Sequence, residues 1–97
     1  MKKTTLNKEA RLTRQAVKTI IDSIISLNNL NNEETYTKTL KDKNVIKIYN
    51  NDKSIVVKEL VDKISGEKTS IYVRVNGIKV LAFYQSYKNK NVYTIKA

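Results

Sequence analysis

The sequence predicts an α+β domain in which an N-terminal amphipathic helix packs on a mostly antiparallel β-meander of about five or six strands. Three observations predict this fold class. Apolar residues recur at helical spacing near the start of the chain, and apolar and polar residues alternate from residue 35 onward. Asn76-Gly77, between two β-prone stretches, is the signature of a type I′ hairpin turn. The 97 residues make a single domain, residues 1–97, with one modest core.

The predicted helix runs from about residue 8 to residue 28, with Asn7 as its N-cap and Glu9 in its first turn. Lys18 is expected to pair with Asp22, one turn further along. The apolar side consists of Leu12, Ala16, Ile20, Ile24 and Leu27. This wide apolar arc fits a helix that lies across a sheet, and it equally fits a helix shared with a second subunit, so a homodimer stays open.

An Asn-rich connection, residues 28–34, is expected to join the helix to a β-rich region, residues 35–97. The segment 35–41 has the alternation of an edge strand. Residues 54–64 are ambiguous because their apolar residues also fit a helical spacing, and we favour a strand since the next residues complete a hairpin. A helix there would instead give a helix pair with a winged hairpin, closer to winged-helix nucleic-acid binders.

The composition excludes several classes of chemistry. The sequence has no cysteine and no histidine, so Ser-His-Asp and Cys-His catalysis and the usual zinc sites are excluded. The acidic residues are scattered, which gives no pair for carboxylate catalysis. We therefore expect no enzyme activity, no metal and no cofactor. A polar N-terminal stretch and short apolar runs predict a cytoplasmic protein without membrane contact.

The charge predicts a polyanionic partner. The 19 Lys and Arg outnumber the 9 Asp and Glu, giving a formal net charge of +10, and this self-repulsion is relieved by binding a polyanion. Basic residues interleaved with tyrosines on strands suit RNA or single-stranded DNA, because cations hold phosphates and rings stack on unpaired bases. The alternative is a solvated sheet face and a solubilising helix ridge. The candidate nucleic-acid-binding residues are Arg11, Arg14, Lys18, Lys47, Tyr49, Lys58, Tyr72, Arg74 and Lys79.

The tail TSIYVRVNGIKVLAFYQSYKNKNVYTIK resembles the later strands of RelE-like messenger-RNA-cleaving toxins. That resemblance implies a metal-independent ribonuclease in which Arg74, Lys79, Tyr84 and Tyr87 act on RNA. Such toxins begin with a strand, place two helices before the main sheet and carry more arginine, so the similarity covers only the final third of the chain.

The whole chain is similar in composition to small early proteins of AT-rich tailed phages, being short, cysteine-free, rich in Lys, Asn and Ile, and beginning MKKTT. This resemblance implies a phage or mobile-element protein that works in the host cytoplasm. It also implies an alternative function, an antitoxin-like inhibitor of a host defence factor such as a toxin–antitoxin ribonuclease, with or without the help of RNA.

Overall fold

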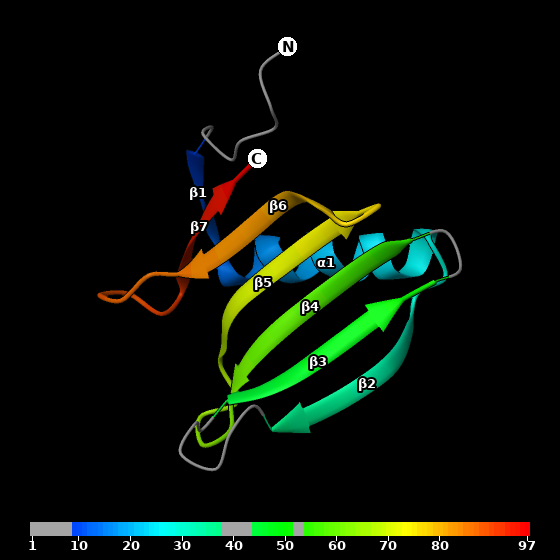
Figure 1. Cartoon of the computed structure of the whole chain (residues 1–97). Helices are drawn as coiled ribbons and strands as arrows, with labels where there is room; N and C mark the ends of the chain where they lie inside the picture. The colour runs from blue at the N-terminus through cyan, green and yellow to red at the C-terminus, as the bar shows by residue number, and fades with distance from the viewer. Residues whose placement is uncertain (1–8, 38–43, 52–53) are drawn as a thin grey trace.

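A helix lies across one face of a seven-stranded antiparallel sheet in the computed structural model, which describes residues 9–37, 44–51 and 54–97 (Figure 1). The strand order in the sheet is β1-β7-β6-β5-β4-β3-β2. The elements are β1 (Glu9–Thr13), α1 (Arg14–Leu27), β2 (Asn31–Thr37), β3 (Asn44–Asn50), β4 (Ile55–Asp62), β5 (Lys68–Val75), β6 (Ile78–Gln85) and β7 (Val92–Lys96).

The predicted fold class is confirmed. From β3 to β7 each strand pairs antiparallel with the one before it, which makes a continuous meander from β2 to β7. β1 pairs with β7 at the far edge, so α1 carries the chain from one edge of the sheet to the other. Within the described part of the chain, no helix has the length and apolar character needed to cross a bilayer.

The helix begins later than predicted, at Arg14 instead of residue 8. The residues before it form β1, which raises the strand number to seven. Ala10 and Leu12 alternate with polar neighbours as a strand requires, and the pairing of Leu12 with Tyr93 overrides the helical spacing. Thr13 is the N-cap, because its hydroxyl accepts a hydrogen bond from the amide of Ala16 at 3.2 Å. The predicted cap, residue 7, lies outside the described residues.

The turns follow the local sequence closely. Asn76 and Gly77 both have positive φ, 52° and 81°, as a type I′ turn requires. The ambiguous segment 54–64 contains strand β4, so the strand interpretation is correct and the winged-helix alternative is wrong. The Asn-rich connection is shorter than predicted, because β2 already begins at Asn31. Asn29 takes a left-handed conformation with φ of 53° just after the helix.

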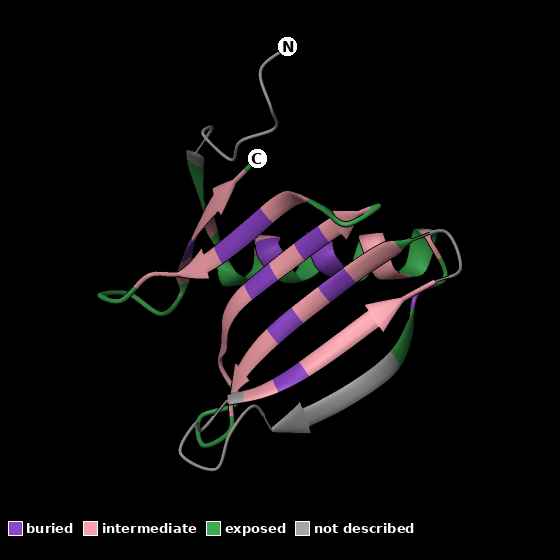
Figure 2. Ribbon diagram, in the orientation of Figure 1, coloured by how far each residue is buried: buried purple, intermediate pink, exposed green. Residues whose placement is uncertain are grey.

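The core lies between α1 and the face of the sheet that it covers, which we call the inner face (Figure 2). The opposite face is called the outer face. From the helix, Val17 and Ile21 are buried against the central strands. The inner-face residues of this core are Val57, Ile71, Val73, Phe83 and Tyr93. Burial of each of these aliphatic or aromatic side chains contributes about 1.5–3 kcal/mol to the stability.

Two polar groups are enclosed in this core. The Tyr93 hydroxyl donates a hydrogen bond to the backbone oxygen of Lys68 at 2.5 Å, and burial raises the pKa of Tyr93. Glu59 is 1% exposed, and its Oε2 accepts a hydrogen bond from Nζ of Lys68 at 3.0 Å. Its Oε1 has no hydrogen-bond partner within the described chain. Lys68 therefore contacts both buried groups, the Tyr93 hydroxyl through its carbonyl and one oxygen of Glu59 through its ammonium.

Replacing Tyr93 with Phe should make the protein less sensitive to alkaline pH. Because the folded-state pKa of Tyr93 is raised, its contribution to stability is complete below the unfolded pKa of about 10 and is lost as the pH rises through the folded value. At neutral pH, Tyr93→Phe should cost about 0.5–1.5 kcal/mol through the lost hydrogen bond. Urea unfolding across the pH range should show this difference narrowing above pH ~10. A constant difference would show that the hydroxyl does not titrate as part of the fold.

Candidate nucleic-acid interface

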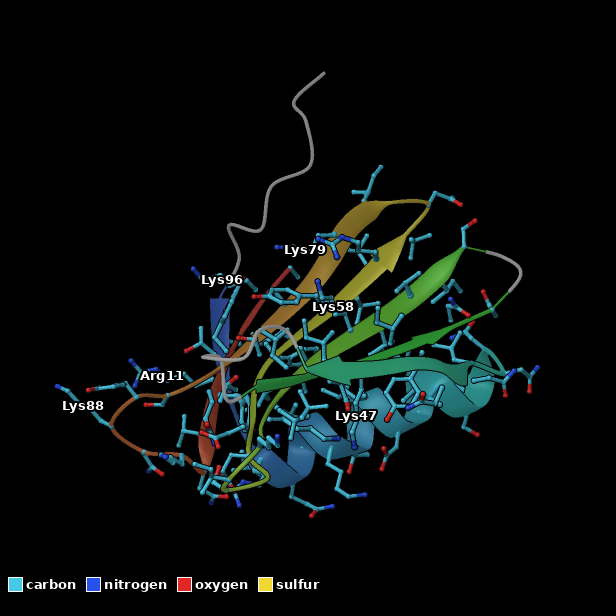
Figure 3. All side chains as sticks on the ribbon, turned by 60° about the horizontal axis from the view of Figure 1, so that its bottom comes forward. Arg11, Lys47, Lys58, Lys79, Lys88 and Lys96 are labelled. Atoms are coloured by element: carbon cyan, nitrogen blue, oxygen red, sulfur yellow. The ribbon has the colours of Figure 1, made fainter. Side chains whose placement is uncertain are left out.

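The outer face of the sheet carries a row of basic and aromatic residues. The strand register places Lys58 of β4 opposite Tyr72 of β5, Tyr72 opposite Ala82 of β6, and Ala82 opposite Lys96 of β7. These residues alternate along their strands with the inner-face core residues, so all four belong to the outer face. Figure 3 shows Lys58, Lys79 and Lys96 together on this side of the sheet, with Lys47 beside the helix.

Four of the outer-face side chains pack on one another, and we call them the lysine–tyrosine cluster: Tyr72, Lys79, Tyr84 and Lys96. Nζ of Lys79 lies 4.4 Å from the centroid of the Tyr72 ring, and Nζ of Lys96 lies 5.7 Å from that of Tyr84. The two ring centroids are 5.9 Å apart, with 75° between the ring planes. Cation–π attraction therefore holds two ammonium groups beside two edge-to-face rings.

A small residue lies beneath the cluster. Ala82 is 0% exposed although it belongs to the face that no helix covers. Its cross-strand neighbours are Tyr72 and Lys96, whose long side chains bury it. The same packing affects Tyr84, since burial and the neighbouring Tyr72 raise the pKa of its hydroxyl against the opposing Lys96 charge. The cluster is thus a packed layer and not a set of separate solvated side chains.

A β-bulge brings Lys79 into this layer. The register between β5 and β6 shifts after Val73, so that Arg74 lies opposite Lys79 and not Val80. Val80 then packs against the core beside Leu81, and Lys79 lies over the Tyr72 ring on the outer face. Bulges commonly re-aim a side chain in this way. Strict alternation from Leu81 would have placed Lys79 on the inner face.

The structure brings together four of the nine predicted site residues and adds a fifth at the edge. Lys58, Tyr72, Arg74 and Lys79 share the centre of the outer face. Arg11 lies in β1, opposite Thr94, and belongs to the same face because its neighbour Leu12 packs on the core. No described carboxylate lies within ion-pair distance of Lys58, Arg74 or Lys79.

Lys47 and Tyr49 do not belong to this surface. In the register they oppose Glu59 and Val57, which are both inner-face residues. Tyr49 packs against the core, and Figure 3 shows Lys47 near the helix. The expectation that they would join the candidate binding surface is therefore not met, because pairing between β3 and β4 puts their side chains on the inner side.

Arg14 and Lys18 also lie on the helix side of the sheet, each with its own partner. Nη2 of Arg14 donates to Oε1 of Glu67 at 2.5 Å and to the backbone oxygen of Lys90 at 3.0 Å. Nζ of Lys18 donates to Oδ2 of Asp22 at 2.8 Å, and this hydrogen bond raises the pKa of Lys18. The Lys18–Asp22 pair was predicted and is confirmed. Arg14 joins the helix start to two loops and so has a structural role.

Two residues of the lysine–tyrosine cluster, Tyr84 and Lys96, were not among the predicted nucleic-acid-binding residues. Alternation predicts the face of each residue within its own strand, but only the register between strands shows that Tyr84 lies beside Tyr72 and that Lys96 lies on the same face. Of the residues implied by the toxin resemblance, Arg74, Lys79 and Tyr84 share the outer face. Tyr87 is 98% exposed in the loop after β6.

A cavity of about 240 Å³ lies on the inner side between α1, β5 and β7. Its cations are Arg14, Lys18 and Lys68, and each is already paired with a carboxylate. Its apolar lining consists of Val17 and Ile21 of the helix with Ile71 of β5. The cavity offers less charge to a phosphate than the outer face does.

The described residues contain no cluster of three or more potential metal ligands. No protein-family model, curated protein or solved structure matched this chain. The candidate site therefore stands on its own geometry.

Replacing Arg14 with Met should separate its structural role from the predicted binding role. The loss of the contacts to Glu67 and Lys90 should lower the free energy of unfolding by about 0.5–1 kcal/mol, a discounted value because the pair is partly exposed. Urea unfolding measures this change. Affinity for single-stranded RNA should stay within about twofold of the unmodified protein, since the side chain lies on the other face. A large loss of RNA affinity with an unchanged free energy of unfolding would show that Arg14 contacts the RNA, contrary to this prediction.

Proposed function

We propose that this protein is a small basic nucleic-acid-binding protein that prefers RNA or single-stranded nucleic acid and holds it on the outer face. One observation carries the proposal: the lysine–tyrosine cluster lies on an uncovered sheet face together with Lys58 and Arg74. Phosphate groups would bind the ammonium and guanidinium groups, and unpaired bases would contact the rings.

The charge distribution supports a polyanion on the outer face in preference to the helix side. On the helix side, Arg14, Lys18 and Lys68 are each neutralised by a carboxylate of the same chain. On the outer face, Lys58, Arg74 and Lys79 have no described carboxylate within ion-pair distance. A phosphate backbone would supply the missing negative charge and release its counterions. With a net charge of +10, that association is also favoured at long range.

Arg74 has a particular place in this proposal. It is next to Lys79 in the register and lies on the same strand face as Tyr72. A guanidinium binds phosphate through two parallel hydrogen bonds, which a lysine cannot do. Arg74 would therefore fix the position of one phosphate, while the neighbouring lysines contribute affinity that depends on salt.

Two matched pairs of substitutions test which face binds. Lys58→Gln with Lys79→Gln removes two charges from the outer face. The control pair is Lys47→Gln, on the inner side, with Lys63→Gln, at an exposed position directly after β4. Fluorescence anisotropy with a labelled single-stranded RNA should show weaker binding only for the outer-face pair. Its slope of log affinity against log salt should fall by about 0.7 per lysine removed.

The remaining outcomes are equally informative. Equal losses for both pairs would mean that net charge alone attracts the RNA, and the proposed surface would be wrong. A protein that binds no nucleic acid at low salt, yet forms a nuclease-resistant complex with one host protein, would favour the inhibitor alternative.

A further inference from the structure

We infer that the outer face accepts two unpaired nucleotides whose bases are splayed apart, as in an RNA loop or a weakly stacked pyrimidine strand. This inference rests on the proposed function and specifies its substrate. The observations that carry it are the angle between the two rings of the cluster and the position of a lysine over each ring.

The ring angle determines how two bases can be arranged. The planes of Tyr72 and Tyr84 differ by 75°, and their centroids are 5.9 Å apart. A base stacks parallel to the ring that it contacts, so bases on these two rings would themselves be nearly perpendicular. Successive bases in a duplex or in a self-stacked single strand are nearly parallel. Two neighbouring nucleotides can therefore stack on both rings only where the strand turns sharply between them.

The lysine over the Tyr72 ring can be displaced by a base at a net gain. Nζ of Lys79 lies 4.4 Å from one ring centroid and Nζ of Lys96 5.7 Å from the other, on side chains at the surface. A cation–π contact of this kind is worth about a 2- to 5-fold factor in an equilibrium constant. Stacking one base on an aromatic side chain is worth about 5- to 150-fold. Replacing the Lys79 contact on Tyr72 with a stacked base is thus favourable, and the released ammonium group remains beside the phosphates.

The packing beneath the rings keeps this site in place. Ala82 lies between Tyr72 and Lys96 in the register and is completely buried on a face that no helix covers, which indicates that the side chains above it lie close to the sheet. Lys58 lies opposite Tyr72 on the next strand, about 4.8 Å away along the direction of the hydrogen bonds. A phosphate that follows a base stacked on Tyr72 would lie near Lys58 or Lys79. Both rings therefore have cations within reach of the adjoining backbone.

The test compares three labelled decamers of equal charge: oligouridine, oligoadenosine and an abasic ribose-phosphate strand. The full chain should bind oligouridine several-fold more tightly than oligoadenosine, because adenines must first be unstacked from one another. It should bind oligouridine about 10-fold or more tightly than the abasic strand, which offers phosphates but no bases. Fluorescence anisotropy at one fixed salt concentration measures all three affinities.

Substitutions of tyrosine assign the effect to the cluster. Tyr72→Leu and Tyr84→Leu should reduce oligouridine binding by about 5-fold or more each and leave abasic-strand binding unchanged. Tyr87→Leu is the matched control, since this tyrosine is 98% exposed in the loop after β6 and makes none of the ring contacts of the cluster, and it should change neither affinity. Tyr72→Phe keeps the ring and should bind oligouridine normally. If circular dichroism shows that a leucine variant does not fold, the test depends on the other leucine variant and on the comparison of oligouridine with the abasic strand.

Failure of this inference is distinguishable from failure of the proposed function. Equal affinity for all three strands would show that only phosphates are bound, so the splayed-base inference would fail and the nucleic-acid function would stand. Tighter binding to oligoadenosine would also overturn it, because the surface would then accept parallel bases. If no strand bound at low salt, the proposed function would fail and the inference with it.

Discussion

One helix can cover only one face of the sheet, and the rest of the molecule depends on that constraint. The 14 residues of α1 span about 21 Å, and seven strands extend over about 29 Å. The inner face therefore has a core of ordinary aliphatic and aromatic residues, and the outer face must cover itself. It does so with long amphipathic side chains whose apolar parts lie on the sheet and whose charged ends remain in water. Ala82 and Ile46 are buried on this face without any help from the helix.

This division gives the same residue types different roles on the two sides of the sheet. On the helix side, the ammonium of Lys68 donates a hydrogen bond to the buried Glu59, and its backbone oxygen accepts one from the Tyr93 hydroxyl. A lysine there provides hydrogen bonds to buried polar groups. On the outer side, Lys79 lies over an aromatic ring and keeps its charge available at the surface. Burying Glu59 with one unpaired oxygen costs free energy, which the apolar core around it has to offset. Three cations on the helix side, Arg14, Lys18 and Lys68, are thus paired with carboxylates, whereas Lys58, Arg74 and Lys79 on the outer side have no described carboxylate within ion-pair distance.

Local sequence patterns predict the fold class well and the site only in part. The Asn76-Gly77 turn and the strand β4 follow from residues within a few positions, so alternation and turn chemistry were sufficient there. The start of the helix was not predictable in this way, because β1 exists only through its pairing with the distant β7. The same limit applies to the site. Alternation indicates which residues of one strand share a face of the sheet. The register between strands decides which residues of different strands share that face. Because of the register, Lys47 does not belong to the outer face and Tyr84 does. The β-bulge that places Lys79 on the outer face also cannot be predicted from the alternation of apolar and polar residues.

The pairing of β1 with β7 also has a consequence for the order of folding during synthesis. Strands β2 to β6 form a meander of neighbouring hairpins, so each can pair soon after its predecessor leaves the ribosome. β1 leaves first but has no partner until Lys96 has emerged, and α1, which follows β1 directly, has its N-terminal hydrogen bond to Asn91. The start of the helix therefore lacks its contacts with β7 and with the residue before it until the last strand has been made. Completion of the fold is thus a late event, after most of the sheet has already formed.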